Sequence, residues 1–228
     1  VLLCKNRQGY ENLCMLVSRA FTDGFYVKPR VDLALLRQYH EGLIALSACL
    51  AGAIPQYLLE EQYDEAKDYA LKLAEIFGED RFYLELQDHG IEEQRPVNQG
   101  VMRIARETGL PLVVTNDAHY LRREDAKMQD VLLCIQTGKT VDDENRMRFS
   151  GTEFYVKSGE EMAALFPQAP EALENTVRIA EMCNMDFIFG KYPLPAFQLP
   201  EGESDARAYL EKLCEQGFQK RYPSAPQE

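Results

Sequence analysis

Short apolar runs that alternate with amphipathic stretches are the feature that most limits what this chain can fold into. Each run is rich in residues favoured in strands, and each is followed by a segment whose apolar residues recur at helical spacing. The predicted strands are Val1–Cys4, Leu43–Cys49, Arg81–Gln87 and Leu110–Asp117. Strands that alternate with helices in this way predict βα units, a parallel sheet and right-handed crossovers. We therefore expect an α/β fold.

Local sequence signals support the predicted helices. Asp32 is a plausible N-cap, Gly78 and Gly109 follow the last turns of two long helices, and Ser158 with Glu161 has the spacing of a capping box. The predicted helices are 6–22, 32–39, 52–60, 64–77, 92–108, 124–136, 158–166, 170–183 and 204–221. Residues 187–200 hold several prolines and are typical of an extended strap or linker.

Composition limits the classes of protein to which this chain can belong. Its net charge of −12 over 228 residues argues against the whole chain being an autonomous DNA binder, because such proteins carry a basic surface. The six cysteines are scattered and form no C-x-x-C motif, which predicts reduced thiols in a cytoplasm. We find neither an apolar run of membrane-spanning length nor a signal peptide, and we expect no membrane association.

The fourth predicted strand ends in a carboxylate and an imidazole, Asp117 and His119. Alternate residues of a strand share one face, so both side chains can point into one site. In barrels and open α/β sheets, functional residues gather at the C-terminal ends of the strands. The Asp-x-His spacing therefore predicts a pair of metal ligands.

Two other predicted strands also end in chemically capable residues. Cys49 ends the second strand, and the third carries Glu85 and leads into Asp88 and His89. Neighbouring strands lie roughly 5 Å apart, so these groups could converge on one pocket. Two or three metals held there would favour phosphoester hydrolysis by metal-bound hydroxide. Taken alone, Cys49 also fits a buried small apolar residue and His89 a turn residue, and these alternatives stay open.

Several long strings resemble one known family and follow the order of that family. They are LLCKNRQGYENLCMLVSRAFTDGFYVKPRVD, GLIALSACLAG, RFYLELQDHG, LPLVVTNDAHYL, VLLCIQTGKT and EFYVKSGEEMAALFPQAPEALENTVRIAEMCN. The resemblance is to the PHP (polymerase and histidinol phosphatase) domain of the bacterial DNA polymerase III alpha subunits. It implies a partial, distorted (β/α)7 TIM-like barrel, of which residues 1–157 would be the C-terminal part. Residues 158–228 would be a helical, proline-containing connector that leads to the polymerase palm.

The resemblance also implies a set of metal ligands. Cys49, Asp117 and His119 look like ligands of divalent metals, with zinc expected and manganese or iron as alternatives. Glu85 and His89 lie in a family segment near the site, but they receive no ligand role. The family's opening His-x-His strand and further His and Glu ligands have no counterpart here, so we expect an incomplete metal cluster in this chain.

The family implies a function for the longer protein. That protein would be a DNA-directed DNA polymerase, a nucleotidyltransferase of bacterial DNA replication, with magnesium in a polymerase core outside this chain. Its implied partners are DNA, a proofreading exonuclease and a sliding clamp, in the bacterial cytoplasm. The 228-residue chain alone is expected to be inactive.

Three roles for the PHP region stay open. The first is a metal-dependent phosphoesterase that gives 3′–5′ exonuclease proofreading or hydrolyses pyrophosphate. The second is a non-catalytic scaffold that stabilises the polymerase and docks a separate proofreading subunit. The third and weaker one is a free-standing phosphatase of the histidinol-phosphate type, which strings such as KNRQGY and IQTGKT argue against.

Overall fold

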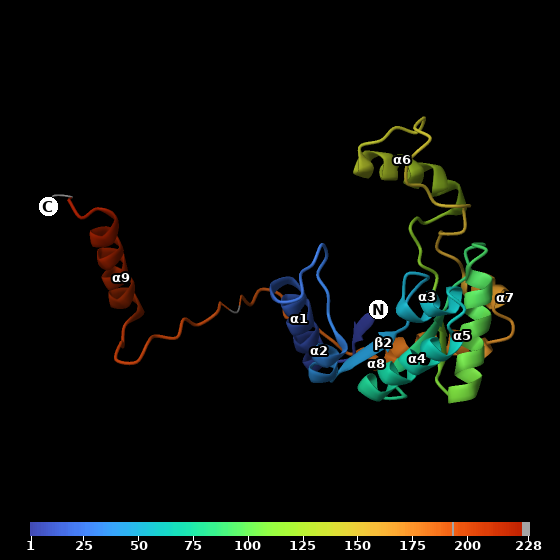
Figure 1. The fold of residues 1–228 in the computed structure, drawn as a ribbon, viewed down its shortest axis with the longest axis horizontal. Coiled ribbons are helices and arrows are strands. Elements are labelled where there is room, and N and C mark those ends of the chain that lie inside the picture. Colours follow the sequence, from blue (N-terminus) through green and yellow to red (C-terminus); the bar gives the residue numbers. More distant parts are fainter. Residues whose placement is uncertain (193, 225–228) are drawn as a thin grey trace. The chain divides into compact units, whose positions relative to one another are not determined.

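The computed structural model describes residues 1–192 and 194–224 and divides the chain into two compact units, 1–186 and 187–228 (Figure 1). Residues 193 and 225–228 of the predicted connector lie outside the described residues. The strands are β1 (Leu2–Cys4), β2 (Leu43–Leu46), β3 (Phe82–Leu86) and β4 (Leu112–Val114). The helices are α1 (Arg7–Thr22), α2 (Leu33–Gln38), α3 (Ala53–Leu59), α4 (Tyr63–Phe77), α5 (Gln94–Thr108), the short 3₁₀ helix η1 (Arg123–Asp125), α6 (Ala126–Thr137), α7 (Gly159–Leu165), α8 (Pro170–Met182) and α9 (Ala206–Arg221).

The helix starts follow from local capping. Asp32 Oδ1 accepts a hydrogen bond from Leu35 N at 2.8 Å and caps α2. At α7, Ser158 N donates to Glu161 Oε2 at 2.8 Å and Glu161 N donates to Ser158 Oγ at 3.2 Å. These bonds satisfy backbone donors that the first turn of a helix leaves unpaired. The predicted cap and capping box are confirmed.

The sheet has the order β1-β2-β3-β4. Strands β2, β3 and β4 are parallel, as the alternating pattern predicts. The prediction is wrong for β1, which pairs antiparallel with β2 and places Cys4 opposite Leu43. The alternating pattern does not fix the direction of a strand, and hydrogen bonds between the end of β1 and the start of β2 hold the antiparallel pair.

The end of β1 and the start of β2 are held together at Gly42. Lys5 N donates to Gly42 O at 2.8 Å, and Asn12 of α1 donates its side-chain amide to Glu41 O at 2.8 Å. Gly9 in the first turn of α1 packs directly on this turn, because a Cβ there would come within 1.9 Å of Gly42 O. The close approach of two backbones therefore requires glycine at position 9.

Side chains of the sheet alternate between two apolar layers. Phe82 and Leu84 are fully buried on one face, against α4 and α5. On the opposite face, Ile44 and Val113 pack with Ile179 of α8. Full burial of each large apolar side chain stabilises the fold by about 1.5–3 kcal/mol, so these two layers fix the sheet and the ends of its strands.

Helix α8 also covers the free edge of β4. Asn175 is 5% exposed, and its Nδ2 donates to the backbone carbonyl of Leu112 at 2.7 Å. Unpaired carbonyls on an edge strand can pair with other chains, and the bond from Asn175 leaves one such carbonyl fewer on β4. The described residues form one four-stranded sheet and do not confirm a (β/α)7 barrel. The first compact unit includes α7 and α8 and ends at Asp186, beyond the domain boundary predicted at residue 157.

The second unit holds an irregular stretch and α9. Asp205 Oδ1 accepts from the backbone N–H groups of Arg207 at 2.7 Å and Ala208 at 2.8 Å, so it caps α9. The ring of Phe197 stacks on that of Tyr209, with 6.2 Å between centroids. An irregular stretch before a final helix matches the predicted secondary structure. Across the described residues, no helix combines the length and apolar character needed to cross a membrane.

Candidate metal centre at the strand ends

A buried polar network joins the C-terminal ends of β2, β3 and β4. Its centre is Glu85, which is 5% exposed. Glu85 Oε2 accepts from Ala48 N at 2.9 Å, and Oε1 accepts from Gln87 Nε2 at 3.1 Å and from the Thr115 hydroxyl. Ser47 Oγ accepts from Glu85 N at 2.8 Å. The three strand ends are therefore joined by hydrogen bonds within the protein, and of the groups predicted to converge this network contains Glu85.

His89 is a second buried member of this region, with 2% exposure. Its Nε2 donates to Asn116 O at 2.7 Å, because a carbonyl can only accept. Its Nδ1 accepts from Gln94 Nε2 at 2.9 Å. The orientation of the Gln94 amide is fixed because its Oε1 accepts from His89 N at 2.7 Å. Both ring nitrogens are therefore engaged by the protein, and His89 has no lone pair left for a metal.

Asp117 and His119 lie just past β4 and are more open to solvent. Their side chains are 43% and 36% exposed, and His119 Nε2 lies 3.5 Å from Asp117 Oδ1. The structure brings the predicted pair together, but by a different route from strand alternation. β4 ends at Val114, and Asp117 has a left-handed backbone with φ of +40°. A turn, and not a strand, sets the geometry of the pair.

Two non-glycine residues just past strand ends have a left-handed backbone. Besides Asp117, Ala48 has φ of +68° directly before Cys49. This conformation costs a residue with a Cβ roughly 1–2 kcal/mol relative to the right-handed one. Such strain persists where surrounding contacts impose it, and it concentrates at functional sites. At position 48 the bond from Ala48 N to Glu85 is one contact that imposes it.

Aromatic side chains separate the two histidines. The ring of Phe154 stacks on His89 with centroids 4.4 Å apart and lies 5.7 Å from His119. Phe149 lies 4.6 Å from the rings of both His119 and Phe154. Sequence reasoning missed these residues because they return from a loop-rich segment far along the chain, and no periodic pattern links them to the strand ends.

Cys49 lies at the end of β2, next to the buried network around Glu85. Its thiol is free and half-buried, beside a cavity of about 10 Å³ that Glu85 and Asn98 also line, which is about the room that one water needs. In residues 1–192 and 194–224, no three His, Cys, Asp or Glu side chains form a group that could hold a metal ion. The described donors therefore offer a pair and not a complete site, and we derive no chemical step through a metal.

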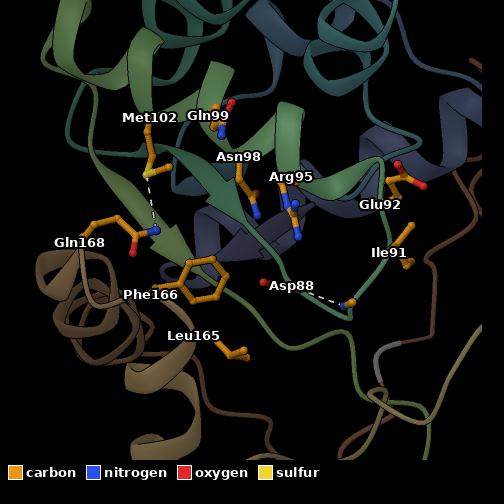
Figure 2. A pocket seen from close by; sticks show the side chains of 11 residues that line it. Asp88, Ile91, Glu92, Arg95, Asn98, Gln99, Met102, Leu165, Phe166 and Gln168 are labelled. Carbon is orange, nitrogen blue, oxygen red and sulfur yellow. Dashed lines mark hydrogen bonds between the residues drawn. The ribbon is translucent and has the colours of Figure 1, made fainter.

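A larger cavity of about 420 Å³ lies beside the first turns of α5 (Figure 2). Figure 2 shows Arg95 and Asn98 of α5 on one side and Phe166 and Gln168 on the other. Asn98 connects this cavity to the network, because its Nδ2 donates to Gln87 O at 2.8 Å. Its described lining includes none of the three predicted metal ligands, so the cavity and the ligand pair are separate features.

Comparison with known proteins bears on the first part of the chain. The family model of the PHP domain matches residues 1–89. Residues 1–89 are thus similar to PHP domains. The PHP match contains Cys49 and ends at His89, whereas Asp117 and His119 lie after it. The PHP family is generally metal-binding, which agrees with the kind of site predicted at the strand ends.

Similarity to longer proteins extends over nearly the whole chain. The DNA polymerase III subunit alpha of Thermus aquaticus is 48% identical over 228 residues, which cover 97% of this chain and 18% of the relative. The subunit alpha of Treponema pallidum is 46% identical, with 100% and 20% covered, and that of Borreliella burgdorferi is 48% identical, with 97% and 19% covered. The chain thus spans about a fifth of the length of these relatives.

Proposed function

We propose that this chain is a segment of a bacterial DNA polymerase III alpha subunit and that the whole protein is a DNA-directed DNA polymerase of replication. The observation that carries the proposal is 48% identity across 97% of the chain to a subunit of that name, together with the PHP match. The polymerase core, with its magnesium, would lie outside this chain. We place the whole protein in the bacterial cytoplasm, with DNA, a proofreading exonuclease and a sliding clamp as partners.

Primer extension tests this proposal. The complete reading frame that contains this sequence is expressed, and the purified protein is given a primed DNA template, deoxynucleotides and magnesium. We expect template-directed extension that stops when one of the four deoxynucleotides is withheld. A complete, folded product that binds primed template but adds no nucleotide contradicts the proposal.

For the PHP region itself, we propose that Asp117 and His119 contribute two ligands to a divalent metal and that Cys49 is a third. Zinc is the expected metal, with manganese or iron as alternatives, because carboxylate, imidazole and thiolate together suit zinc. Support comes from the 3.5 Å approach of Asp117 to His119 and from the solvent exposure of both side chains. The larger fold we propose for this region is a (β/α)7 PHP barrel, with residues 1–157 as part of it.

Metal analysis of the complete protein tests the ligand assignment. Asp117→Asn and His119→Asn are each expected to lower the bound metal per protein, and Asp88→Asn is the matched control. Asp88 is a nearby carboxylate whose Oδ1 accepts from Gly90 N at 2.9 Å, so its loss should leave metal content unchanged. Equal metal content in all four proteins removes Asp117 and His119 from the site.

A scaffold role is the second candidate function, and the buried hydrogen bonds at the strand ends favour it. The polar groups of Glu85 and His89 form hydrogen bonds that join the strand ends, as expected for a region with a structural role. Degradation of short single-stranded DNA from its 3′ end separates the two roles. A phosphoesterase loses this activity in Asp117→Asn, whereas a scaffold loses thermal stability and polymerase activity together and keeps any hydrolysis unchanged.

A further inference from the structure

A second cavity, of about 230 Å³, lies directly beside the Asp117–His119 pair. Tyr120, which lines it, follows His119 in the chain, and Phe149, which also lines it, packs on the His119 ring at 4.6 Å. Its charged lining residues are Lys127 at the start of α6, Asp130 one turn later, and Arg146 and Arg148. The walls therefore combine two aromatic rings with three cations and one carboxylate.

Arg146 is the most deeply placed of these cations. Its side chain is 5% exposed. Nη2 donates to Asp130 Oδ2 at 2.8 Å, and Nη1 donates to Oδ1 of the same carboxylate. The N–H on Nε is buried and has no hydrogen-bond partner among the described residues. A buried donor without an acceptor is costly, so Arg146 is held in place mainly by its ion pair with Asp130.

The other two cations have no carboxylate of their own. The Arg146 guanidinium holds the pKa of Asp130 below its ordinary value, so this carboxylate stays charged and paired. Arg148 Nη2 donates to the backbone carbonyls of Asp143 at 3.3 Å and Glu144 at 3.4 Å. Lys127 makes no ion pair within the part of the chain that the structure describes. The cavity thus keeps two uncompensated positive charges on a chain whose net charge is −12.

We propose that this cavity is a phosphate-binding subsite that takes the phosphate group of a nucleotide or of a single nucleic-acid strand. Guanidinium and ammonium groups bind phosphate oxygens through charge-assisted hydrogen bonds, and both Arg148 and Lys127 line this cavity. The rings of Tyr120 and Phe149 give a surface on which a base or sugar can pack. A volume of about 230 Å³ is smaller than that of a typical drug-sized pocket, which suits one small charged group.

This inference rests on the proposed function only for the source of the phosphate. A protein that acts on DNA would supply the group from a strand, whose neighbouring backbone would then lie next to Asp117 and His119. The charge and geometry of the cavity predict phosphate binding whether or not a metal is bound at that pair. The binding experiment is therefore done without metal, so that a failure of the metal proposal leaves its result unchanged.

The test is a titration of the ¹⁵N-labelled 228-residue chain in EDTA at constant ionic strength, followed by amide chemical shifts. The probes are inorganic phosphate, thymidine 5′-monophosphate and a short oligothymidylate. We expect saturable shifts at the start of α6 and around residues 146–149. Lys127→Gln combined with Arg148→Gln should weaken binding by about tenfold or more, since each charged contact is worth about that factor.

Two further variants keep the test decisive. Lys139→Gln removes a cation of the loop after α6 that does not line the cavity, and it should change affinity by less than about twofold. Arg146→Lys keeps a cation opposite Asp130 but loses the planar guanidinium, and it should weaken phosphate binding while the chain stays folded. Tighter binding of oligothymidylate than of phosphate assigns the subsite to a nucleic-acid strand, and equal binding assigns it to free phosphate. Unchanged affinity in the Lys127 and Arg148 double variant, or no saturable shift at these amides, overturns the proposal.

Discussion

His89 and His119 are the same residue type, each placed just past the end of a parallel strand, yet the fold uses them differently. His89 is 2% exposed and both of its ring nitrogens are bonded to protein atoms. The His119 side chain is 36% exposed, and its Nε2 faces the Asp117 carboxylate. Phe154 stands between them. Residue type at a strand end therefore identifies a region, whereas burial and the closure of hydrogen bonds decide which residue is free to bind a ligand.

The carboxylates repeat the same contrast. Glu85 is buried and accepts hydrogen bonds from three different residues, whereas Asp117 is 43% exposed and is held in a left-handed turn. Losing a group of the first kind should therefore cost stability, and losing one of the second kind should cost ligand binding. Four measurements test this division.

The largest effect is expected for Glu85→Leu. This change leaves the donors of Ala48, Gln87 and Thr115 without their acceptor inside the core. We expect a loss of about 3 kcal/mol in the free energy of unfolding, or roughly 6–12 °C in Tm, measured by urea and thermal unfolding. Glu124→Gln, on the exposed 3₁₀ turn before α6, is the control and should stay within about 0.5 kcal/mol. Equal stability of Glu85→Leu and wild type would show that the network does not hold the strand ends.

Replacing each histidine with alanine tests the contrast directly. His89→Ala removes two ring hydrogen bonds and the stacking on Phe154, so we expect a loss of about 2 kcal/mol. His119→Ala removes a half-exposed ring and should cost about 0.5 kcal/mol. Chemical denaturation of the two variants under one set of conditions gives the difference. Similar losses for both would mean that His119 is as structural as His89.

Ala48→Gly, unlike the preceding variants, should increase the stability of the fold. Ala48 has φ of +68°, where glycine has no penalty from a Cβ, while its N–H can still donate to Glu85. We expect a gain of about 1 kcal/mol, reduced by the greater freedom of glycine in the unfolded chain. Ala53→Gly, at the first residue of α3, is a control in which glycine should not help. A loss of stability in Ala48→Gly would show that the left-handed turn carries no strain.

Local signals in the sequence were enough to place nearly every helix and strand. Asp32 and Ser158 begin helices because capping depends on residues three positions apart. The direction of β1 was not predictable in the same way, since it is set by pairing with residues far along the chain, such as that of Cys4 with Leu43. The strand-end pattern also led to Glu85 and to the Asp117–His119 pair. It could not reveal that Phe154 lies between the two histidines. Nor could it reveal that Gln94 and Asn116 form hydrogen bonds with the ring nitrogens of His89, because these contacts join distant parts of the chain.

The smallest effect on stability is expected for Asp117→Asn in the absence of metal. Asparagine tolerates a left-handed backbone as well as aspartate does, and the Asp117 side chain is 43% exposed, so the change in unfolding free energy should stay within about 0.5 kcal/mol. Excess zinc makes this variant informative, because a ligand that binds only the folded state at about 100 times its Kd adds about 2.7 kcal/mol. Wild type should gain stability with zinc, Glu85→Leu should gain a similar amount from a lower starting point, and Asp117→Asn should gain least. Equal zinc-dependent shifts in Tm for wild type and Asp117→Asn would mean that the exposed pair is not the ligand-binding half of this site.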